Sequence, residues 1–364
     1  MKVRSNPPAS HKGFTLVEVM VAMVIGMIGI IIMMQVFATA EGQKRATTGT
    51  GDAQSSGAMA LYELQRDVRQ GGYGINSMSL LGCGLALGAP SNATLPARAL
   101  GPAIINPQKA DKSLLLPVGD KDSDDTLLVA FGNSGGSPEG DAITTVNDKI
   151  LAVQTPGNFF VGDAVVAAPA SDGNVACALT LNLDRVAAVA APWVTVGLAG
   201  ATPGDLLFNF GATPTIRAYA IRGGNLTVCD YLLNDCSDAA KKNDPAVWLA
   251  IASNIVSLRA QYGRDTNTAA GVDTWDQETP ATACGWVRAA ALRIAVVARS
   301  SQADQGEITA VPPTWAGSAV ADNNPDPAAP FDLTKTKDNW KNYRYKVFET
   351  VVPIRNLPWM AKCP

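Results

Sequence analysis

The chain has 364 residues, of which 47% are hydrophobic and 17% are charged, and its formal net charge is −3. This is the composition of a globular protein with a low charge density, and it excludes a disordered chain. The length allows one large domain or two ordinary ones. Because the chain has no excess of basic residues, its composition does not indicate nucleic acid as a ligand.

Histidine is scarce, and its position limits the chemistry that the chain can perform. The only histidine is His11, which lies in an N-terminal segment that we expect to be removed. A mature chain without histidine cannot build a Ser-His-Asp triad, a Cys-His dyad or an imidazole metal site. Carboxylate-only and Ser-Lys mechanisms stay open. The sequence therefore favours a protein that is not an enzyme, and we expect no cofactor and no metal.

The cysteines are even in number. They are Cys83, Cys177, Cys229, Cys236, Cys284 and Cys363. In an exported chain an even count predicts a disulfide framework, whereas in a reduced compartment the same residues would be buried free thiols. Six cysteines allow fifteen pairings. We expect one pair to join Cys229 to Cys236, because the short loop between them follows a predicted hairpin.

The N-terminus carries the strongest signal in the sequence. Residues 14–40 are apolar, and as a helix they would span about 40 Å, enough to cross a hydrocarbon core of about 30 Å. The basic residues before them predict that the C-terminal bulk lies outside the cytoplasm. Two ordinary interpretations are a plain membrane anchor and a signal peptide cut near Ala38-Thr39-Ala40. Both leave Glu18 unexplained, because a carboxylate inside an apolar helix is costly.

The residues around this acid resemble a known signal. Residues 12–18, with the sequence KGFTLVE, are similar to the class III signal of type IV prepilins and pseudopilins. In that family a membrane peptidase cuts after the glycine and methylates the new N-terminal phenylalanine. The resemblance implies cleavage between Gly13 and Phe14 and N-methylation of Phe14. It also implies that Glu18 is the helix carboxylate that acts in filament assembly.

The physical chemistry of Glu18 agrees with an assembly role. A buried carboxylate needs an opposite charge nearby. The free amine created at Phe14 is such a charge, but helix geometry points it away from the Glu18 of its own chain. A neighbouring subunit, displaced along the filament axis, can supply the amine. This pairing would fix the register between subunits, as single polar groups do in coiled coils.

Beyond residue 40 the sequence still predicts a helix, but its apolar residues are fewer. Leu64 and Val68 recur on one helix face, and Gly71-Gly72 is expected to end the helix. We therefore expect helix over residues 14–70. Glycines in its middle lower helix stability by about 1 kcal/mol each relative to alanine. The alternative is a break or linker over residues 42–57.

Later segments resemble a narrower family, the PilW-type minor pilins. They are residues 61–74, 123–129, 261–263 with Trp275 and Arg293, and 348–356. The resemblance implies a low-abundance subunit that helps to start type IV pilus assembly and stays at or near the tip. Such pili serve twitching motility, adhesion and DNA uptake.

The same resemblance implies partners and a location. The partners are other minor pilins, the major pilin, a tip adhesin, the prepilin peptidase and the inner-membrane assembly platform. Before assembly the chain would cross the inner membrane once, with its C-terminal domain in the periplasm. After assembly it would lie in a pilus on the cell surface.

Two other functions compete with this interpretation. A type II secretion pseudopilin shares the N-terminal signal, but the length of the chain and the match at residues 348–356 argue against it. A secreted enzyme or binding protein with a cleaved signal peptide would lose the residues up to Ala40. A pilin would instead keep Phe14, so the mass of the mature protein separates the two.

The rest of the chain predicts mostly β structure, with short apolar runs bounded by turn residues. Strands are expected at residues 126–131, 163–167, 176–183, 216–221, 226–229, 291–299 and 343–347. Residues 222–225, with the sequence RGGN, indicate a hairpin turn between two of these strands. Residues 302–331 are rich in proline and polar residues and predict a long surface loop.

One acidic run could be taken for a calcium loop. Asp120, Asp122 and Asp124 have the spacing that begins such a loop. However, Asp125 stands where the loop needs glycine, and Phe131 stands where it needs a bidentate glutamate. We therefore expect a solvated turn before a strand.

The expected fold class is α+β with the type IV pilin fold. A long N-terminal α-helix, partly transmembrane, packs on a β-rich C-terminal domain with an antiparallel sheet. The expected divisions are a leader at residues 1–13, the hydrophobic helix at 14–40, its amphipathic continuation at 41–72 and the globular domain at 73–364.

Overall fold

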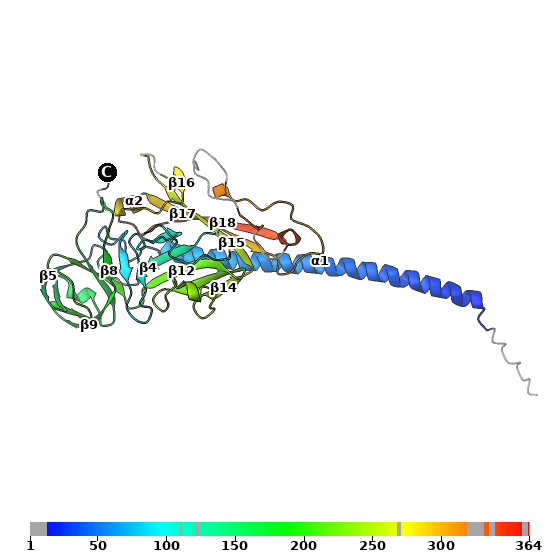
Figure 1. Ribbon diagram of the computed structural model, residues 1–364, viewed down its shortest axis with the longest axis horizontal. Helices are drawn as coiled ribbons and strands as arrows, with labels where there is room; N and C mark the ends of the chain where they lie inside the picture. The colour runs from blue at the N-terminus through cyan, green and yellow to red at the C-terminus, as the bar shows by residue number, and fades with distance from the viewer. Residues whose placement is uncertain are drawn as a thin grey trace, which may run out of the picture.

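The structure is a computed structural model of the chain (Figure 1). It describes residues 13–109, 111–120, 124–267, 271–318, 331–334, 339–358 and 363. Of the leader expected at residues 1–13, only Gly13 lies within the described residues. Residues 319–330 of the expected surface loop also lie outside them.

One helix, α1 (Leu16–Gln70), runs without interruption for 55 residues, roughly 80 Å. Thr15 caps its start, and Gly71 follows its last turn. The expected long helix is confirmed, and the break considered over residues 42–57 is wrong. Helical stability in proteins comes mostly from tertiary packing. Here that packing outweighs the low helix propensity of the glycines.

The two halves of α1 have different surroundings. No residue of the helix before Gly49 is buried. The buried residues of the second half are Gly49, Ala53, Gly57, Ala60, Leu64, Asp67 and Val68. Since these recur at spacings of three and four, they form one face of the helix. Figure 1 shows the first half projecting from the domain while the second half runs into it.

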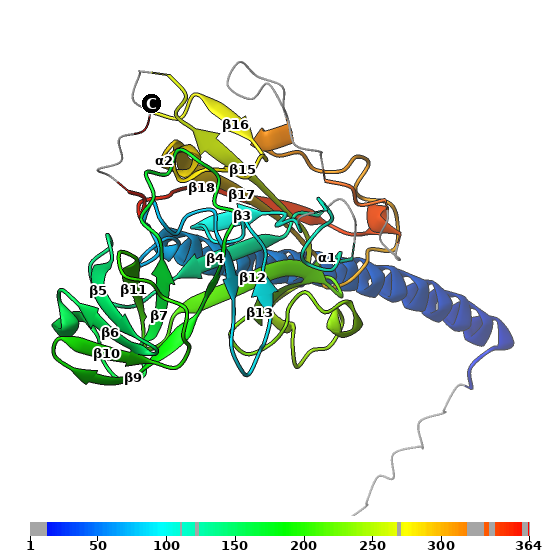
Figure 2. The same ribbon diagram turned by 60° about the vertical axis from the view of Figure 1, so that its left-hand side comes forward.

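Two antiparallel sheets pack around the second half of α1, and α1 contacts strands of both (Figure 2). The first sheet has four strands, in the order β16 (Thr274–Asp276), β15 (Ile255–Arg264), β17 (Ala289–Arg299) and β18 (Tyr345–Pro353). The second has five, in the order β14 (Leu249–Ser253), β13 (Asn225–Asp230), β12 (Thr215–Arg222), β4 (Leu127–Phe131) and β3 (Ala103–Ile105). The largest hydrophobic core is shared by the helix and these sheets.

A closed barrel lies at the end of the molecule opposite the free half of α1 (Figures 1 and 2). Its strands, in spatial order, are β10 (Trp193–Val196), β6 (Ile150–Val153), β5 (Asp141–Asn147), β11 (Leu206–Gly211), β7 (Ala164–Ala168) and β9 (Asp184–Ala190). The barrel has a hydrophobic core of its own, which includes Val165 and Val194.

The remaining elements are short. A three-stranded sheet has the order β2 (Thr94–Leu95), β1 (Gly84–Ala86) and β8 (Thr180–Asn182). The short helices are α2 (Ala283–Val287), η1 (Pro156–Asn158), η2 (Ala239–Lys241), η3 (Ala316–Ser318) and η4 (Trp340–Asn342).

The structure confirms the β-rich domain and corrects some of its expected strands. The expected hairpin is present, since β12 pairs with β13 through a turn at Gly223 and Gly224, both of which have positive φ. The strand expected at residues 176–183 is only three residues long, because β8 pairs only with the three-residue β1. The barrel was not predicted, because its strands do not reveal from local pattern which partners they pair with.

Candidate functional site

The N-terminal motif begins at an open stretch of chain before α1. Phe14 is 88% exposed, and a Cβ added at Gly13 would meet no atom within 4 Å. Thr15 and Glu18 form a capping box. The Glu18 backbone N–H donates to Thr15 Oγ1 at 3.3 Å, and Glu18 Oε2 accepts from the Thr15 N–H at 2.9 Å and from the Thr15 hydroxyl at 3.0 Å. The side chain of Glu18 thus begins the helix on which it lies.

Thr15 is the residue of this motif that sequence reasoning missed. The pattern Thr-x-x-Glu before an apolar run is the sequence signature of a capping box, so the signal was present in the sequence. Only Oε2 of Glu18 accepts a hydrogen bond from the part of the chain that the structure describes. The other carboxylate oxygen is open to a further donor.

The first half of α1 contains a run of residues, 19–34, that has no polar side chain. Of the described residues, this helix is the one long and apolar enough to cross a membrane, and its most apolar 18-residue stretch is 0% buried within the chain. The exposed side chains include Met20, Ile25 and Phe37, which are at least 60% exposed. Such a surface needs lipid or other helices around it, because contiguous exposed apolar patches mark interaction sites.

At the other end of α1, Asp67 joins the helix to the domain. Asp67 is 1% exposed. One oxygen of its carboxylate accepts from Arg66 Nε at 3.0 Å, and the other accepts from Arg217 Nη1 at 2.9 Å and from the Tyr219 hydroxyl. Arg217 and Tyr219 lie on β12. This buried carboxylate is therefore paired and hydrogen-bonded on both oxygens, as burial of a charge requires.

Burial and the neighbouring charges change the pKa values of Arg217 and Tyr219, the two residues of this cluster on β12. Burial raises the pKa of Tyr219 well above its ordinary value, and the neighbouring Asp67 carboxylate raises it further. Burial is the largest effect on Arg217 and opposes its charge, but the hydrogen bond to Asp67 and the negative charge of Asp67 together outweigh burial and raise the pKa of that guanidinium. Tyr219 therefore stays a neutral donor and Arg217 stays a cation, so the link between helix and sheet persists across physiological pH.

The C-terminal segment that resembles PilW sequences contacts α1 at two points. Asn356 Nδ2 donates to the last carbonyl oxygens of the helix region, those of Arg69 at 3.3 Å and of Gln70 at 3.2 Å. Phe348, on β18, packs against Gly57, where an added Cβ would lie 2.1 Å from the ring. Glycine is required at this position because the Phe348 ring lies so close to the helix backbone. From the sequence, Gly57 had been expected only to weaken the helix.

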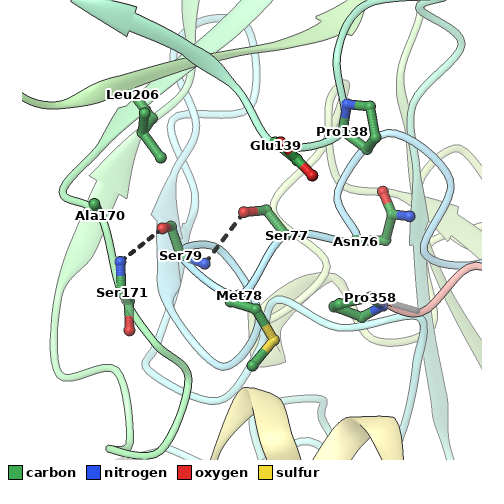
Figure 3. A pocket seen from close by; sticks show the side chains of 10 residues that line it. All are labelled: Asn76, Ser77, Met78, Ser79, Pro138, Glu139, Ala170, Ser171, Leu206 and Pro358. Atoms are coloured by element: carbon green, nitrogen blue, oxygen red, sulfur yellow. Dashed lines mark hydrogen bonds between the residues drawn. The ribbon is translucent and has the colours of Figure 1, made fainter. Parts of the chain in front are cut away.

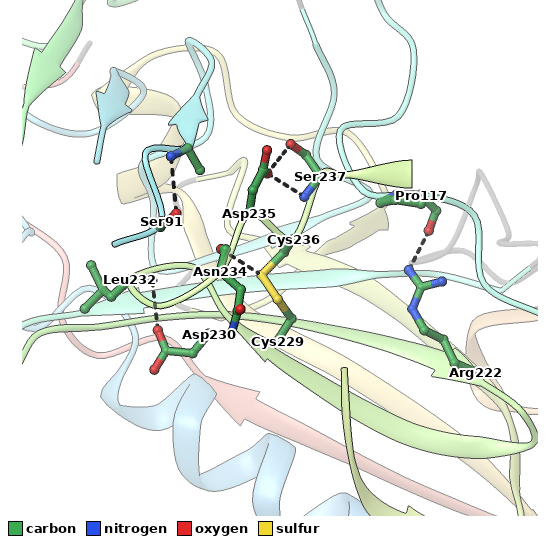
Figure 4. The surroundings of a disulfide bond; sticks show 11 residues. Ser91, Pro117, Arg222, Cys229, Asp230, Leu232, Asn234, Asp235, Cys236 and Ser237 are labelled. Atoms are coloured by element: carbon green, nitrogen blue, oxygen red, sulfur yellow. Dashed lines mark hydrogen bonds between the residues drawn. A yellow bond between two sulfur atoms is a disulfide. The ribbon is translucent and has the colours of Figure 1, made fainter. Parts of the chain in front are cut away.

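The six cysteines form three disulfides in the structure. They are Cys83–Cys177, Cys229–Cys236 and Cys284–Cys363. The pair favoured from the sequence, Cys229 with Cys236, closes the loop after β13 (Figure 4). The other two pairs span 94 and 79 residues of sequence, and local spacing gives no indication of such long pairings.

The acidic run expected to form a solvated turn before a strand is described only at its two ends, which both contact the domain, and β4 follows it. Asp120 accepts from the N–H groups of Gly223 at 2.8 Å and Gly224 at 2.6 Å, which fixes the hairpin turn. Asp125 is 3% exposed and lies 3.6 Å from Arg259, and burial raises its pKa. Asp122 lies outside the described residues. No cluster of metal ligands occurs in the part of the chain that the structure describes.

Two family models match the chain. The prokaryotic N-terminal methylation motif matches residues 8–34, and the type IV pilus-assembly protein W family matches residues 227–356. The two matches together cover less than half of the chain, and they support a PilW-like type IV pilin. The second match runs from β13 through β18 and includes both Phe348 and Asn356, so the matched segment contains strands that pack on α1 and the residue that caps its end. No curated protein and no solved structure matches the chain.

The family that the second model describes consists of structural proteins of the type IV pilus and not of enzymes, so the matches support a structural, pilus-associated role. The methylation motif and the apolar half of α1 account for membrane anchoring and for association with the pilus. The structure brings Glu18 to the start of α1, and it places the cysteines far from it in the domain. The expected site residues thus fall into an N-terminal group and a set of cross-links.

Proposed function

We propose that this chain is a minor pilin that initiates type IV pilus assembly and lies at or near the pilus tip. The observation that carries the proposal is the free half of α1, an apolar helix with no buried residue before Gly49 that continues without a break into a large domain. Such a helix is stable only among lipids or among other helices, so the chain is suited to pass from membrane to filament core.

Maturation is the first step of this proposal. Prepilin peptidase cuts between Gly13 and Phe14 and methylates Phe14, which leaves residues 14–40 as the membrane and filament helix. The open backbone around Gly13 supports this, because a protease cleft needs an extended and accessible chain. Residues 41–72 then continue the helix into the globular domain at residues 73–364, which faces the periplasm before assembly.

Assembly is the second step. In the precursor, Thr15 is the partner of Glu18, and only one of its two carboxylate oxygens is used. After cleavage, the new amine at Phe14 of a neighbouring subunit pairs with the free oxygen of Glu18. Inside an apolar bundle this pair offsets the desolvation of both charges. It also sets the axial position of one helix against the next.

The shape of the chain supports the proposed tip position. A shaft subunit is repeated around a helical lattice, so its domain must be compact enough to repeat. Here two sheets and a barrel follow α1, and the barrel lies at the end of the molecule farthest from the free half of the helix (Figure 1). A domain of this extent is easier to place once, at an end of the filament. The proposed partners are other minor pilins, the major pilin, a tip adhesin and the inner-membrane assembly platform.

Deletion of the gene tests the priming role. Surface pili should be abolished or sharply reduced while the major pilin stays in the membrane, and a plasmid copy of the gene should restore them. Immunogold labelling of the restored pili should mark their ends. Regular labelling along the shaft would show a shaft subunit and overturn the tip position. Normal piliation of the deletion strain would overturn the priming role.

A further inference from the structure

Among the residues that the structure describes, β18 is the one long strand at the edge of a sheet. It has nine residues and closes one side of the four-stranded sheet, where it pairs with β17. The other edge strands are short, since β16, β3 and β8 have three residues each, β2 has two and β14 has five. The barrel is closed and has no edge.

The backbone groups of β18 alternate between the two sides of the strand. At one end of the strand pair, the Ser300 N–H donates to the carbonyl oxygen of Arg344 at 2.8 Å. At the other end, the Ile354 N–H donates to the carbonyl oxygen of Ala290 at 2.9 Å. Because every second residue of an antiparallel strand is bonded to its neighbour, the even-numbered residues of β18 bond to β17. The N–H and C=O groups of the odd-numbered residues point away from it.

Three of these outward-facing residues form an open edge: Val347, Glu349 and Val351. In the part of the chain that the structure describes, nothing bonds to their outward backbone groups. Glu349 is exposed, and Val351 is 49% exposed. Pro353 follows on the same side of the strand, where its missing N–H costs no bond to β17. The open edge therefore ends before this proline.

The strand that carries the open edge is fixed at both ends. Before it, the Arg344 N–H donates to Ser300 Oγ at 3.2 Å. After it, Asn356 Nδ2 bonds to the last carbonyl oxygens of the helix region, and Pro358 lines a cavity of about 250 Å³ beside the loop that follows α1 (Figure 3). The open edge is thus formed before a partner arrives, which lowers the entropy cost of binding.

An edge of this length is a template for a further strand, and proteins usually protect it with charges, prolines or a covering segment. An extended polypeptide presents N–H and C=O groups at the spacing of the open edge, so it can satisfy all of them at once. The residue that lies directly opposite Val351 contacts its exposed side chain. An apolar residue at that position would bury this surface.

A second copy of this chain does not fit the open edge. Two identical edges that pair through a twofold axis run antiparallel. β18 runs in the same direction as α1, because Ser300 at its start lies against Gly49 and Asn356 after its end bonds to Gln70. Antiparallel pairing of two copies would point the free halves of their helices in opposite directions. The two helices could not then enter the same membrane or filament.

We propose that an extended segment of a different pilus subunit adds to the open edge of β18 as a further strand of the four-stranded sheet. Its backbone pairs with Val347, Glu349 and Val351, and its residue opposite Val351 is apolar. The identity of the partner as a pilus subunit rests on the proposed function. The open edge itself is a property of the fold.

Site-specific photo-crosslinking in piliated cells tests this proposal. Two variants of the full chain carry p-benzoylphenylalanine, one at Glu349 and one at Val351, and mass spectrometry identifies the cross-linked peptides. We expect both positions to link to one segment of one other subunit, at residues about two positions apart, because side chains on one face of a strand recur with period two. The same label at Val161, which is 68% exposed on the barrel, should not link to that segment.

Val351→Pro tests the backbone pairing itself. The nitrogen of residue 351 faces away from β17, so proline there keeps the existing ladder and removes one N–H of the open edge. The yield of the cross-link from position 349 should fall roughly tenfold. Val351→Thr is the matched control, because it keeps the N–H and a β-branched side chain, and its cross-link should persist. Denaturant unfolding in detergent micelles should show that both variants are folded.

Several results would overturn the proposal. They are cross-links from the two positions to unrelated segments, cross-links only within this chain or to a second copy of it, and an undiminished cross-link in folded Val351→Pro. If Val351→Pro does not fold, the links from positions 349 and 351 decide alone. Failure of the priming role is distinct, since normal piliation of the deletion strain would overturn that role, whereas the cross-links report on the edge of β18 in either case.

Discussion

The two halves of α1 share one continuous helix but obtain their stabilising contacts from different sources. The half before Gly49 has no buried residue, although most of its side chains are apolar. The half after it buries a face made largely of small residues, on which the sheets approach closely. Burial of apolar surface contributes about 25 cal/mol per Å². The domain supplies this contribution for the second half, and membrane or neighbouring subunits must supply it for the first.

The two acidic residues near the ends of the helix show the same difference. Among the described residues, the side chain of Glu18 bonds only to Thr15, three residues away. Asp67 is bonded to Arg217 and Tyr219, which are 150 and 152 residues away in sequence. A substitution in the second half should therefore change the stability of the folded domain. A substitution in the first half should change maturation and assembly and leave the domain as it is.

Gly13→Val should have the largest effect of all, because maturation is an all-or-none event. A branched side chain next to the cleavage site prevents the extended backbone from fitting a protease cleft. Since no atom lies within 4 Å of an added Cβ at Gly13, the fold itself should be unaffected. Intact-mass measurement should find the full-length precursor in the membrane fraction.

Gly42→Ala is the control for this prediction, because an added Cβ at Gly42 also meets no atom within 4 Å. This variant should lose the leader normally. If Gly13→Val lost the leader normally, cleavage would not depend on Gly13, and Phe14 would not be the N-terminal residue of the mature chain.

Asp67→Ala should give the largest loss of domain stability. It leaves Arg217 without its carboxylate partner and the Tyr219 hydroxyl without its acceptor. Tyr219 is buried and loses its acceptor, whereas Arg217 is 35% exposed and can be solvated, so the loss should be about 2–4 kcal/mol. Denaturant unfolding of the full-length protein in detergent micelles measures the change.

Glu41→Ala is the control on the exposed part of the same helix, where Glu41 pairs with Arg45 at 3.2 Å. An exposed pair contributes at most about 1 kcal/mol. If Asp67→Ala and Glu41→Ala changed the free energy of unfolding by the same amount, the second half of α1 would not be anchored through its buried carboxylate.

The sequence predicted the long helix and its end because both depend on local signals. The apolar run, the spacing of Leu64 and Val68, and Gly71-Gly72 are all read within a few residues. The Asp67 cluster, the barrel and two of the three disulfides could not be predicted, because each joins residues far apart in the chain. Local pattern carries no information about such partners.

Gly57 shows most clearly where local reasoning failed. Its helix propensity indicated a weak point, whereas in the fold its missing Cβ gives Phe348 the space in which the ring packs. Each glycine lowers the stability of a helix by about 1 kcal/mol relative to alanine. The packing of the Phe348 ring on Gly57, which lies 291 positions earlier in the sequence, outweighs this cost. The second half of the helix therefore stays intact.

Gly57→Ala should therefore destabilise the domain moderately, by about 1–3 kcal/mol, because the added methyl group overpacks the contact with Phe348. Gly51→Ala, on the open side of the helix, should instead raise stability by up to about 1 kcal/mol. Denaturant unfolding of both variants measures the difference in sign. Adding Phe348→Leu to Gly57→Ala should recover part of the loss, and a stabilising effect of Gly57→Ala alone would contradict the packing argument.

Glu18→Ala should have the smallest effect on domain stability, within about 0.5 kcal/mol, because Glu18 is exposed and lies in the half of α1 that has no buried residue. Its effect on assembly should be large, because the amine of a neighbouring subunit loses its partner in an apolar bundle.

Thr15→Ala separates the two roles of this carboxylate. It removes the capping hydroxyl that bonds to Glu18 but keeps the charge. If Glu18 acts between subunits, the amount of protein recovered from sheared pili should fall sharply for Glu18→Ala and little for Thr15→Ala. Equal losses for the two variants would show that Glu18 serves only to cap its own helix.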